Sequence, residues 1–228
     1  MRALKLRAIR RNAFGQDRIP SLDQMIGGSI VPGRLLKRNM SNKKGSKIWT
    51  VGHSTRTLVE FLELLESNEI EALADVRRYP GSLRYPHFKE ANLAASLADG
   101  GIEYAPFKQL GGRRRPKPDS SNTVWRSESF RGYADYMETS EFKVAMVYLL
   151  GLARRKRTAI MCSEAVWWRC HRALVSDYLK AAGITVEHII SLKKKEIHPF
   201  TSAARLLDGK LFYGAEQESS KFFARRHA

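Results

Sequence analysis

The feature that most constrains the fold is an alternation of short apolar runs and amphipathic segments between residues 47 and 192. The apolar runs have the length and composition of buried strands, and the segments between them have helical spacing. Strands that are joined through helices run parallel to one another. We therefore predict an α/β fold, a three-layer α/β/α domain with a mostly parallel sheet of about five strands. The predicted strands are Ile48–Val51, Ile70–Val76, Ile102–Pro106, Thr158–Cys162 and Val186–Ile190.

Capping and stop signals delimit the predicted helices. Thr57 and Glu60 can form a capping box, and glycines directly after two of the segments favour helix ends there. We expect a break in the longest helix near Thr139. A loop rich in Gly, Arg, Pro and Ser, Leu110–Ser129, follows the third strand. The predicted helices are Thr57–Ser67, Lys89–Ala98, Phe130–Arg154 and Arg169–Ala182.

The chain divides into three parts by composition. Residues 1–46 are basic and lack periodicity, which is typical of a disordered arm. Met40, however, is followed by a short polar lead and then by the first strand, so the residues before it could also be an upstream extension of the gene start. Residues 47–192 form the predicted α/β domain, and residues 193–228 form a basic C-terminal tail with little pattern.

The charge of the chain bears on its partners. The sequence has 40 Lys and Arg residues against 23 Asp and Glu residues, a net charge of +17. Nucleic acid is the usual polyanionic partner of such a protein, and an ordinary basic enzyme is the alternative. No apolar run approaches the ~20 residues that cross a bilayer, and the two cysteines do not make a disulfide framework. We expect a cytoplasmic protein with reduced thiols and no membrane partner.

Polar residues collect where the predicted strands end. The carboxyl ends of parallel strands meet at one edge of a sheet, and ligands bind in the crevice beyond that edge. Residues that are far apart in the sequence should therefore share one site. They are His53, Ser54, Asp75, Arg77, Ser82, Cys162, Glu164, His171 and Arg172.

Three of these residues are candidates for proton transfer. Neighbouring tryptophans would shield Glu164 from water, and such desolvation raises the pKa of a carboxyl and suits general acid–base catalysis. Asp75 or His53 would be its partner. Each candidate also has a structural interpretation. Glu164 can stabilise the N-terminus of the next helix, Asp75 can form an ion pair with Arg77, and His53 can brace the first turn.

Arginine and aromatic side chains are the candidates for substrate binding. Arg77, Arg113 and Arg172 can hold phosphate groups. The loop that carries Arg113 also carries Trp125, and basic groups beside an aromatic ring fit single-stranded nucleic acid, with Trp167 as a second stacking surface. A solvated basic loop and tryptophans packed in the core are the alternatives. The predicted binding set also includes Ser54, Ser82 and His171.

The cysteines suggest two other kinds of chemistry. Cys162 could be a thiol nucleophile, since a helix N-terminus stabilises a thiolate. Arg169, however, follows it after six residues, and the segment 164–168 is bulky and has no glycine, which does not fit a phosphate-binding thiol loop. A buried apolar role is the alternative. Cys162, Cys170 and His171 could ligate a metal. Because adjacent residues on a helix point about 100° apart, we expect no metal site, and we expect no cofactor.

An ordered series of short motifs resembles the family numbered 488 among the domains of unknown function, over about residues 47–192. The resemblance implies a prokaryotic cytosolic protein with a compact α/β fold, and suggests an enzyme that works on nucleic acids. Tyr85 and Lys89 stand where similar proteins often carry Asn. The motifs are Gly52-His53-Ser54-Thr55, Asp75-x-Arg77-x-x-Pro80-x-Ser82, Gly101-Ile102-x-Tyr104, Leu110-Gly111-Gly112, Met161-Cys162-x-Glu164, Cys170-His171-Arg172 and His188-Ile189.

These patterns favour an enzyme, or an enzyme-like protein, that acts on nucleic acid or a nucleotide without a metal. Base excision, base modification and phosphodiester hydrolysis all need an acid–base pair in a basic cleft. Two alternatives remain open. One is a small-molecule enzyme that uses Cys162 as a thiol, and the other is a nucleic-acid-binding module without catalytic activity.

Overall fold

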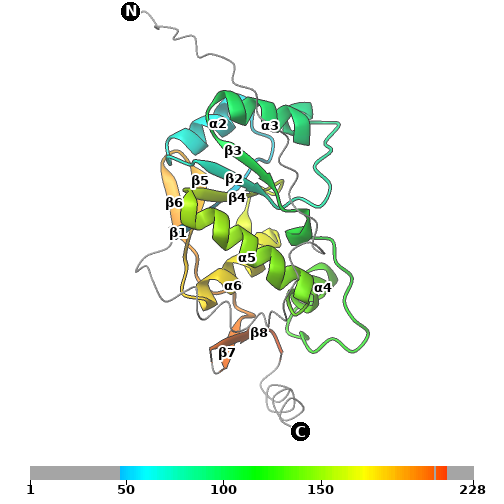
Figure 1. Ribbon diagram of the computed structural model, residues 1–228. Coiled ribbons are helices and arrows are strands. Elements are labelled where there is room, and N and C mark those ends of the chain that lie inside the picture. Colours follow the sequence, from blue (N-terminus) through cyan, green and yellow to red (C-terminus); the bar gives the residue numbers. More distant parts are fainter. Residues whose placement is uncertain (1–46, 208, 215–228) are drawn as a thin grey trace, which may run out of the picture.

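The computed structural model describes residues 47–207 and 209–214 of the chain. The predicted basic arm, residues 1–46, and the end of the C-terminal tail lie outside the described residues. Figure 1 shows a central sheet with helices on both of its faces. The prediction of an α/β domain with a mostly parallel sheet is confirmed.

The sheet has six strands in the order β3-β2-β4-β1-β5-β6. The first five are parallel, and β6 pairs with β5 in the antiparallel direction. Strand β6 lies at the edge of the sheet. Its sequence, KKEI, is mostly polar, so a search for apolar runs does not predict this strand. The strands are β1 (Lys47–Gly52), β2 (Ala72–Asp75), β3 (Glu103–Pro106), β4 (Thr158–Cys162), β5 (Thr185–Ser191) and β6 (Lys194–Ile197).

Two apolar layers bury the sheet. Helices α2 and α3 pack through Phe61 and Leu93 on one face, against Trp49 and Val51 of β1. Helices α4, α5 and α6 cover the other face, which includes Ile48 of the same strand. Successive side chains of a strand point to opposite faces, so β1 is buried at every position except the half-buried Lys47. The helices are α2 (Leu58–Glu66), α3 (Glu90–Asp99), α4 (Glu128–Met137), α5 (Ser140–Arg155) and α6 (Arg172–Ala181).

Local signals set several of the helix boundaries. The capping box of Thr57 and Glu60 is present at the start of α2. The expected break near Thr139 is also present, because the Thr139 hydroxyl accepts a hydrogen bond from the Phe142 amide and thereby caps α5. Helix α6 starts at Arg172, three residues later than predicted, and a short 3₁₀ turn, η4 (Trp167–Arg169), precedes it.

Part of the predicted C-terminal tail is ordered. Besides β6, it contains the antiparallel hairpin of β7 (Arg205–Leu207) and β8 (Lys210–Phe212). Tyr213, directly after β8, is buried in the core cluster beneath α4, α5 and α6. Within the described residues, none of the helices has the combination of length and apolar character that crossing a bilayer requires.

Candidate functional site

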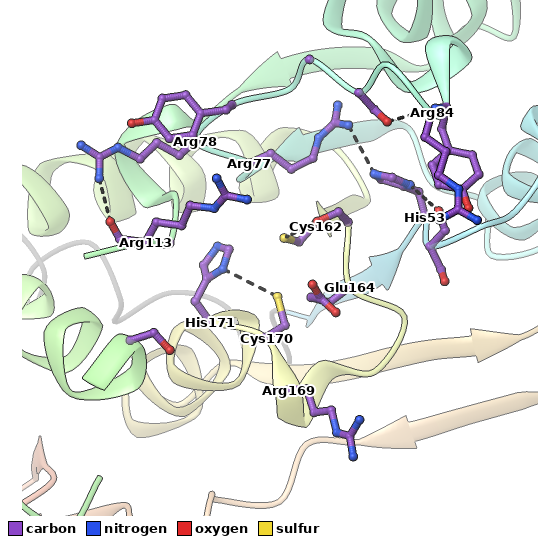
Figure 2. Close-up of a pocket in the computed structure, with 18 of the residues that line it drawn as sticks. His53, Arg77, Arg78, Arg84, Arg113, Cys162, Glu164, Arg169, Cys170 and His171 are labelled. Atoms are coloured by element: carbon purple, nitrogen blue, oxygen red, sulfur yellow. Dashed lines mark hydrogen bonds between the residues drawn. The ribbon is translucent and has the colours of Figure 1, made fainter. Parts of the chain in front are cut away.

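A cavity of about 680 Å³ opens at the carboxyl edge of the sheet. Its walls come from the segments that follow β1, β2 and β4, from the loop after β3, and from the residues just before α6. Figure 2 shows side chains from these segments around one hollow. Of the residues predicted from the sequence, the cavity brings together His53, Ser54, Arg77, Ser82, Arg113, Cys162, Glu164 and His171.

The cavity wall is strongly cationic. Five arginines contribute to it, whereas Glu164 is the one carboxylate among the described lining residues. The sequence analysis did not single out Arg78 and Arg84 as candidates, although both belong to the same segment after β2 as Arg77. The five arginines are Arg77, Arg78, Arg84, Arg113 and Arg169.

The ion pair of Asp75 and Arg77 is buried, with side-chain exposures of 1% and 6%. The Arg77 Nε and one terminal nitrogen bind the Asp75 carboxylate at 2.9 and 2.6 Å. The other terminal nitrogen donates to the Phe88 carbonyl oxygen at 2.8 Å and lies 3.3 Å from His53 Nε2. Since a guanidinium has five N–H donors, these contacts leave about one for the cavity. The Asp75 carboxylate also accepts from the Arg77 amide and the Tyr104 hydroxyl, so both of its oxygens are occupied and its role is to position Arg77.

His53 braces the same arginine. Its Nδ1 lies 3.0 Å from the Ser54 carbonyl oxygen, which can only accept, so the proton is on Nδ1 and Nε2 accepts from Arg77. The ring stacks on Phe88, with centroids 4.1 Å apart. Burial, together with the charge of Arg77, lowers the pKa of His53 to about 4. The imidazole is neutral at pH 7, and both of its nitrogens are already engaged.

Glu164 and Arg172 differ from their expected environments. Glu164 lies in the cavity wall, but its side chain is exposed, so the expected shielding by tryptophans is wrong. Arg172 is 1% exposed and faces inward. Its guanidinium donates to the Glu164 carbonyl oxygen and, through Nε, to Cys170 Sγ at 3.4 Å. It holds the loop between β4 and α6 and does not line the cavity.

The predicted stacking tryptophans are packed elsewhere. Trp125 is half-buried against Phe130 and Tyr213. Trp167 is buried, and its ring lies nearly parallel to that of His188, with centroids 4.4 Å apart. Neither is part of the cavity wall as described. The aromatic rings in that wall are instead Tyr79, Tyr85, Phe130 and the histidines His53 and His171.

Close approach of the chain explains the Leu110-Gly111-Gly112 motif. A Cβ atom at Gly111 would lie 2.6 Å from the Cβ of Arg78, and one at Gly112 would lie 2.9 Å from His171 Nδ1. Real Cβ atoms do not approach other atoms this closely. The two glycines therefore let the loop after β3 reach across the cavity, where the Arg113 carbonyl oxygen accepts a hydrogen bond from Arg78 at 2.9 Å.

Two thiols and an imidazole converge at the base of the cavity. Sγ of Cys162, Sγ of Cys170 and a ring nitrogen of His171 all lie within 4.8 Å of one another, and Figure 2 shows the three side chains pointing together. The assumption that Cys170 and His171 diverge on a helix is wrong. Cys170 has an extended backbone (φ −123°, ψ 148°) after η4, and α6 begins only after His171.

The environment of the two sulfurs is unequal. A hydrogen bond to Cys170, together with burial, raises the pKa of Cys162 to about 12. Burial also acts to raise the pKa of Cys170, but the hydrogen bond from Cys162 and the charge and hydrogen bonds of Arg172 outweigh it and lower that pKa to about 6. The two shifts are coupled: the thiolate form is disfavoured at Cys162 and favoured at Cys170.

These features define a class, a three-layer α/β domain with a cationic, cysteine-containing cavity at the carboxyl edge of its sheet. The chain belongs to the family described as domain of unknown function DUF488, whose model matches residues 57–179. That match includes the ion pair after β2, the Gly-Gly motif and the cysteine cluster. No curated protein and no solved structure matches the chain.

Proposed function

We propose that this protein is an enzyme that acts on nucleic acid or a nucleotide and binds its phosphate groups in the cavity. The observation that carries the proposal is that the described lining residues include five arginines against one carboxylate. Guanidinium groups match phosphate oxygens in charge and in planar geometry. A hollow of about 680 Å³ has room for a nucleotide unit, because small-molecule sites occupy roughly 300 to 1,000 Å³.

A second hollow favours a polymer over a free nucleotide. It has a volume of about 450 Å³, shares Arg78 and Arg113 with the main cavity, and adds Arg115 and Lys117 to the cationic lining. Arg114 is fixed there over the Tyr136 ring, 3.6 Å from its centroid. Basic groups that continue past one binding pocket suit a phosphate backbone that passes from one to the other.

Within this proposal Glu164 is the group for proton transfer. It is the carboxylate that faces the cavity, whereas Asp75 and His53 are occupied in holding Arg77. A thiol enzyme based on Cys162 has less support, because the hydrogen bond to Cys170 and burial raise the pKa of Cys162 to about 12 and keep it protonated at neutral pH.

Equilibrium binding across a range of salt concentrations tests the proposal. Fluorescently labelled single-stranded and double-stranded DNA and RNA would be titrated with the full chain. Replacing Arg113 with Ala should weaken binding and lower the slope of log K against log salt by about 0.7 to 0.9, the value for one phosphate contact. The matched control is Arg155→Ala. Arg155 is the exposed last residue of α5 and is not among the residues that line the cavity, so the variant removes the same charge elsewhere.

Two outcomes would contradict the proposal. One is the absence of binding both to the four nucleic acids and to a free nucleotide near ~0.15 M salt, the physiological range. The other is an equal loss of affinity in Arg113→Ala and Arg155→Ala, since this would mean that overall charge and not the cavity attracts the nucleic acid.

A further inference from the structure

The side chains of Cys162, Cys170 and His171 have the composition of a zinc site. A tetrahedral zinc ion with bonds of about 2.3 Å to sulfur and 2.0 Å to nitrogen separates its ligand atoms by roughly 3.5 to 3.8 Å. Cys170 Sγ lies 3.6 Å from His171 Nδ1, and all three ligand atoms lie within 4.8 Å of one another. Small rotations of the side chains therefore suffice to enclose one ion.

The imidazole is held in the orientation that a metal ligand needs. His171 Nε2 lies 3.2 Å from the Val76 carbonyl oxygen, which can only accept, so Nε2 carries the proton. Nδ1 is left with its lone pair directed at the sulfurs. A carbonyl oxygen that fixes the tautomer through the far nitrogen is the usual outer partner of a metal-bound histidine. Gly112 leaves this space open, because a Cβ there would lie 2.9 Å from Nδ1.

The sulfurs have support of the same kind. Arg172 Nε donates to Cys170 Sγ at 3.4 Å, and N–H groups that point at a sulfur stabilise its thiolate form. Cys162 is fixed at the carboxyl end of the buried strand β4. Among the residues that the structure describes, the cluster contains no carboxylate. Two thiolates and an imidazole are soft and borderline ligands, which favour Zn²⁺ over Mg²⁺ or Ca²⁺.

We propose that these three residues bind one Zn²⁺ ion, with the fourth position of the ion open to the cationic cavity. All three ligands line that cavity, and three protein ligands with one open position are typical of a catalytic rather than a structural zinc site. Metal binding itself does not depend on the proposed function. Only the further role of the ion, as a Lewis acid toward a phosphate-bearing substrate among the arginines, rests on it.

Cobalt substitution tests the site directly. The full chain would be reduced, stripped with a chelator and titrated with Co²⁺, then with Zn²⁺. We expect one Co²⁺ per chain with the intense visible bands of tetrahedral thiolate ligation, and stoichiometric displacement of Co²⁺ by Zn²⁺. Zn²⁺ should also protect both thiols from a thiol reagent, since bound thiolates are unreactive. The titration reads metal binding without any assay of activity.

Variants separate the ligands from bystanders. Cys170→Ser should abolish the bands, and His171→Gln should weaken Zn²⁺ binding by more than about 100-fold, beyond the ~10- to 100-fold typical of outer partners. His87→Gln is the matched control, because His87 is also half-buried but stands outside the cluster. If Cys170→Ser does not fold, the metal titrations of His171→Gln and of the wild type still test the zinc site.

A reduced, folded protein that binds no Co²⁺ or Zn²⁺ while both thiols react would overturn the zinc site and leave a pair of thiols. Loss of Zn²⁺ affinity in the His87 variant equal to that in the His171 variant would overturn it as well. Neither result would affect the binding of nucleic acid that depends on Arg113, so the two proposals can fail separately.

Discussion

The cavity and a buried hydrogen-bond network that extends from Thr50 of β1 to Asp177 use similar residues in opposite ways. In the network, Thr50 Oγ1 lies 2.6 Å from His188 Nδ1, His188 Nε2 lies 2.9 Å from His198 Nδ1, and His198 Nε2 lies 3.0 Å from an Asp177 oxygen. The Asp177 carboxylate also accepts from the Thr201 amide and hydroxyl and from the Tyr213 hydroxyl. All of these groups partner one another inside the protein.

The cavity differs because donors in its wall face solvent. Arg84, Arg113 and Arg169 have exposed side chains that point around a hollow, whereas Asp177, His188 and His198 are at most 1% exposed. A histidine next to an acid is therefore not a site by itself. Internal saturation of the hydrogen bonds marks the network as structural, and spare donors around a hollow mark the cavity as the place for a ligand.

The largest effect that tests this contrast is the loss of Asp177. Replacing it with Ala leaves a buried imidazole, an amide and two hydroxyls without their acceptor. We expect the free energy of unfolding to fall by about 3–5 kcal/mol. Urea unfolding followed by circular dichroism measures it, with exposed Asp99→Ala as a control that should change less than ~0.5 kcal/mol. A loss below ~1 kcal/mol in the Asp177 variant would mean that the network does not stabilise the fold.

The fold and the location of the cavity could be predicted because both follow from periodicity and parallel topology. Gly52-His53, Asp75-x-Arg77 and Cys162-x-Glu164 each end a buried strand, and parallel strands bring such ends to one edge. The roles of the residues at that edge were less predictable. Asp75 and His53 both form hydrogen bonds with Arg77, and a sequence pattern does not reveal such contacts.

The errors have two physical sources. Residues after Leu192 provide packing partners that the tail gave no reason to expect: Tyr213 packs against Trp125, and β6 pairs beside His188, the residue on which Trp167 stacks. A shift of three residues in the start of α6 changed the geometry of Cys170 and His171 from diverging to converging. Helix boundaries are the least certain part of any sequence-based assignment, and the expectation that these two side chains diverge depended on one such boundary.

The second test uses pH. Burial, with the neighbouring His198 and the charge of Arg172, lowers the pKa of His188 to about 2, while an unfolded histidine titrates near ~6.5. Below pH 6.5 the unfolded chain takes up a proton that the folded protein refuses. Stability is therefore lost as the pH falls, by up to about 1.4 kcal/mol per pH unit and about 2 kcal/mol between ~6.5 and ~4.5.

Unfolding free energies of the wild type and His188→Gln at a series of pH values measure this contribution. His53 titrates in the same direction, since burial and the charge of Arg77 lower its pKa to about 4, and it affects both proteins equally. The difference between the two pH profiles therefore isolates His188. Parallel profiles from neutral pH to pH 4.5 would mean that His188 is not held neutral by the network.

The smallest effect on stability, and the most informative about function, is expected for Glu164. Its side chain is exposed and its main-chain carbonyl, not its carboxylate, accepts from Arg172, so Glu164→Gln should change the free energy of unfolding by less than ~0.5 kcal/mol. Affinity for nucleic acid should stay the same or rise slightly as a negative charge leaves the cavity. If Glu164 transfers protons, single-turnover rates on a bound nucleic acid should fall about 10²- to 10⁴-fold. An unchanged rate in Glu164→Gln would exclude that role. If the wild type shows no detectable turnover and the variant binds nucleic acid normally, the results would favour a binding module without catalytic activity. Asp177 and Glu164 are therefore expected to differ in both respects. The Asp177 carboxylate stabilises the fold and lies away from the cavity, whereas the Glu164 carboxylate faces the cavity and contributes little to stability.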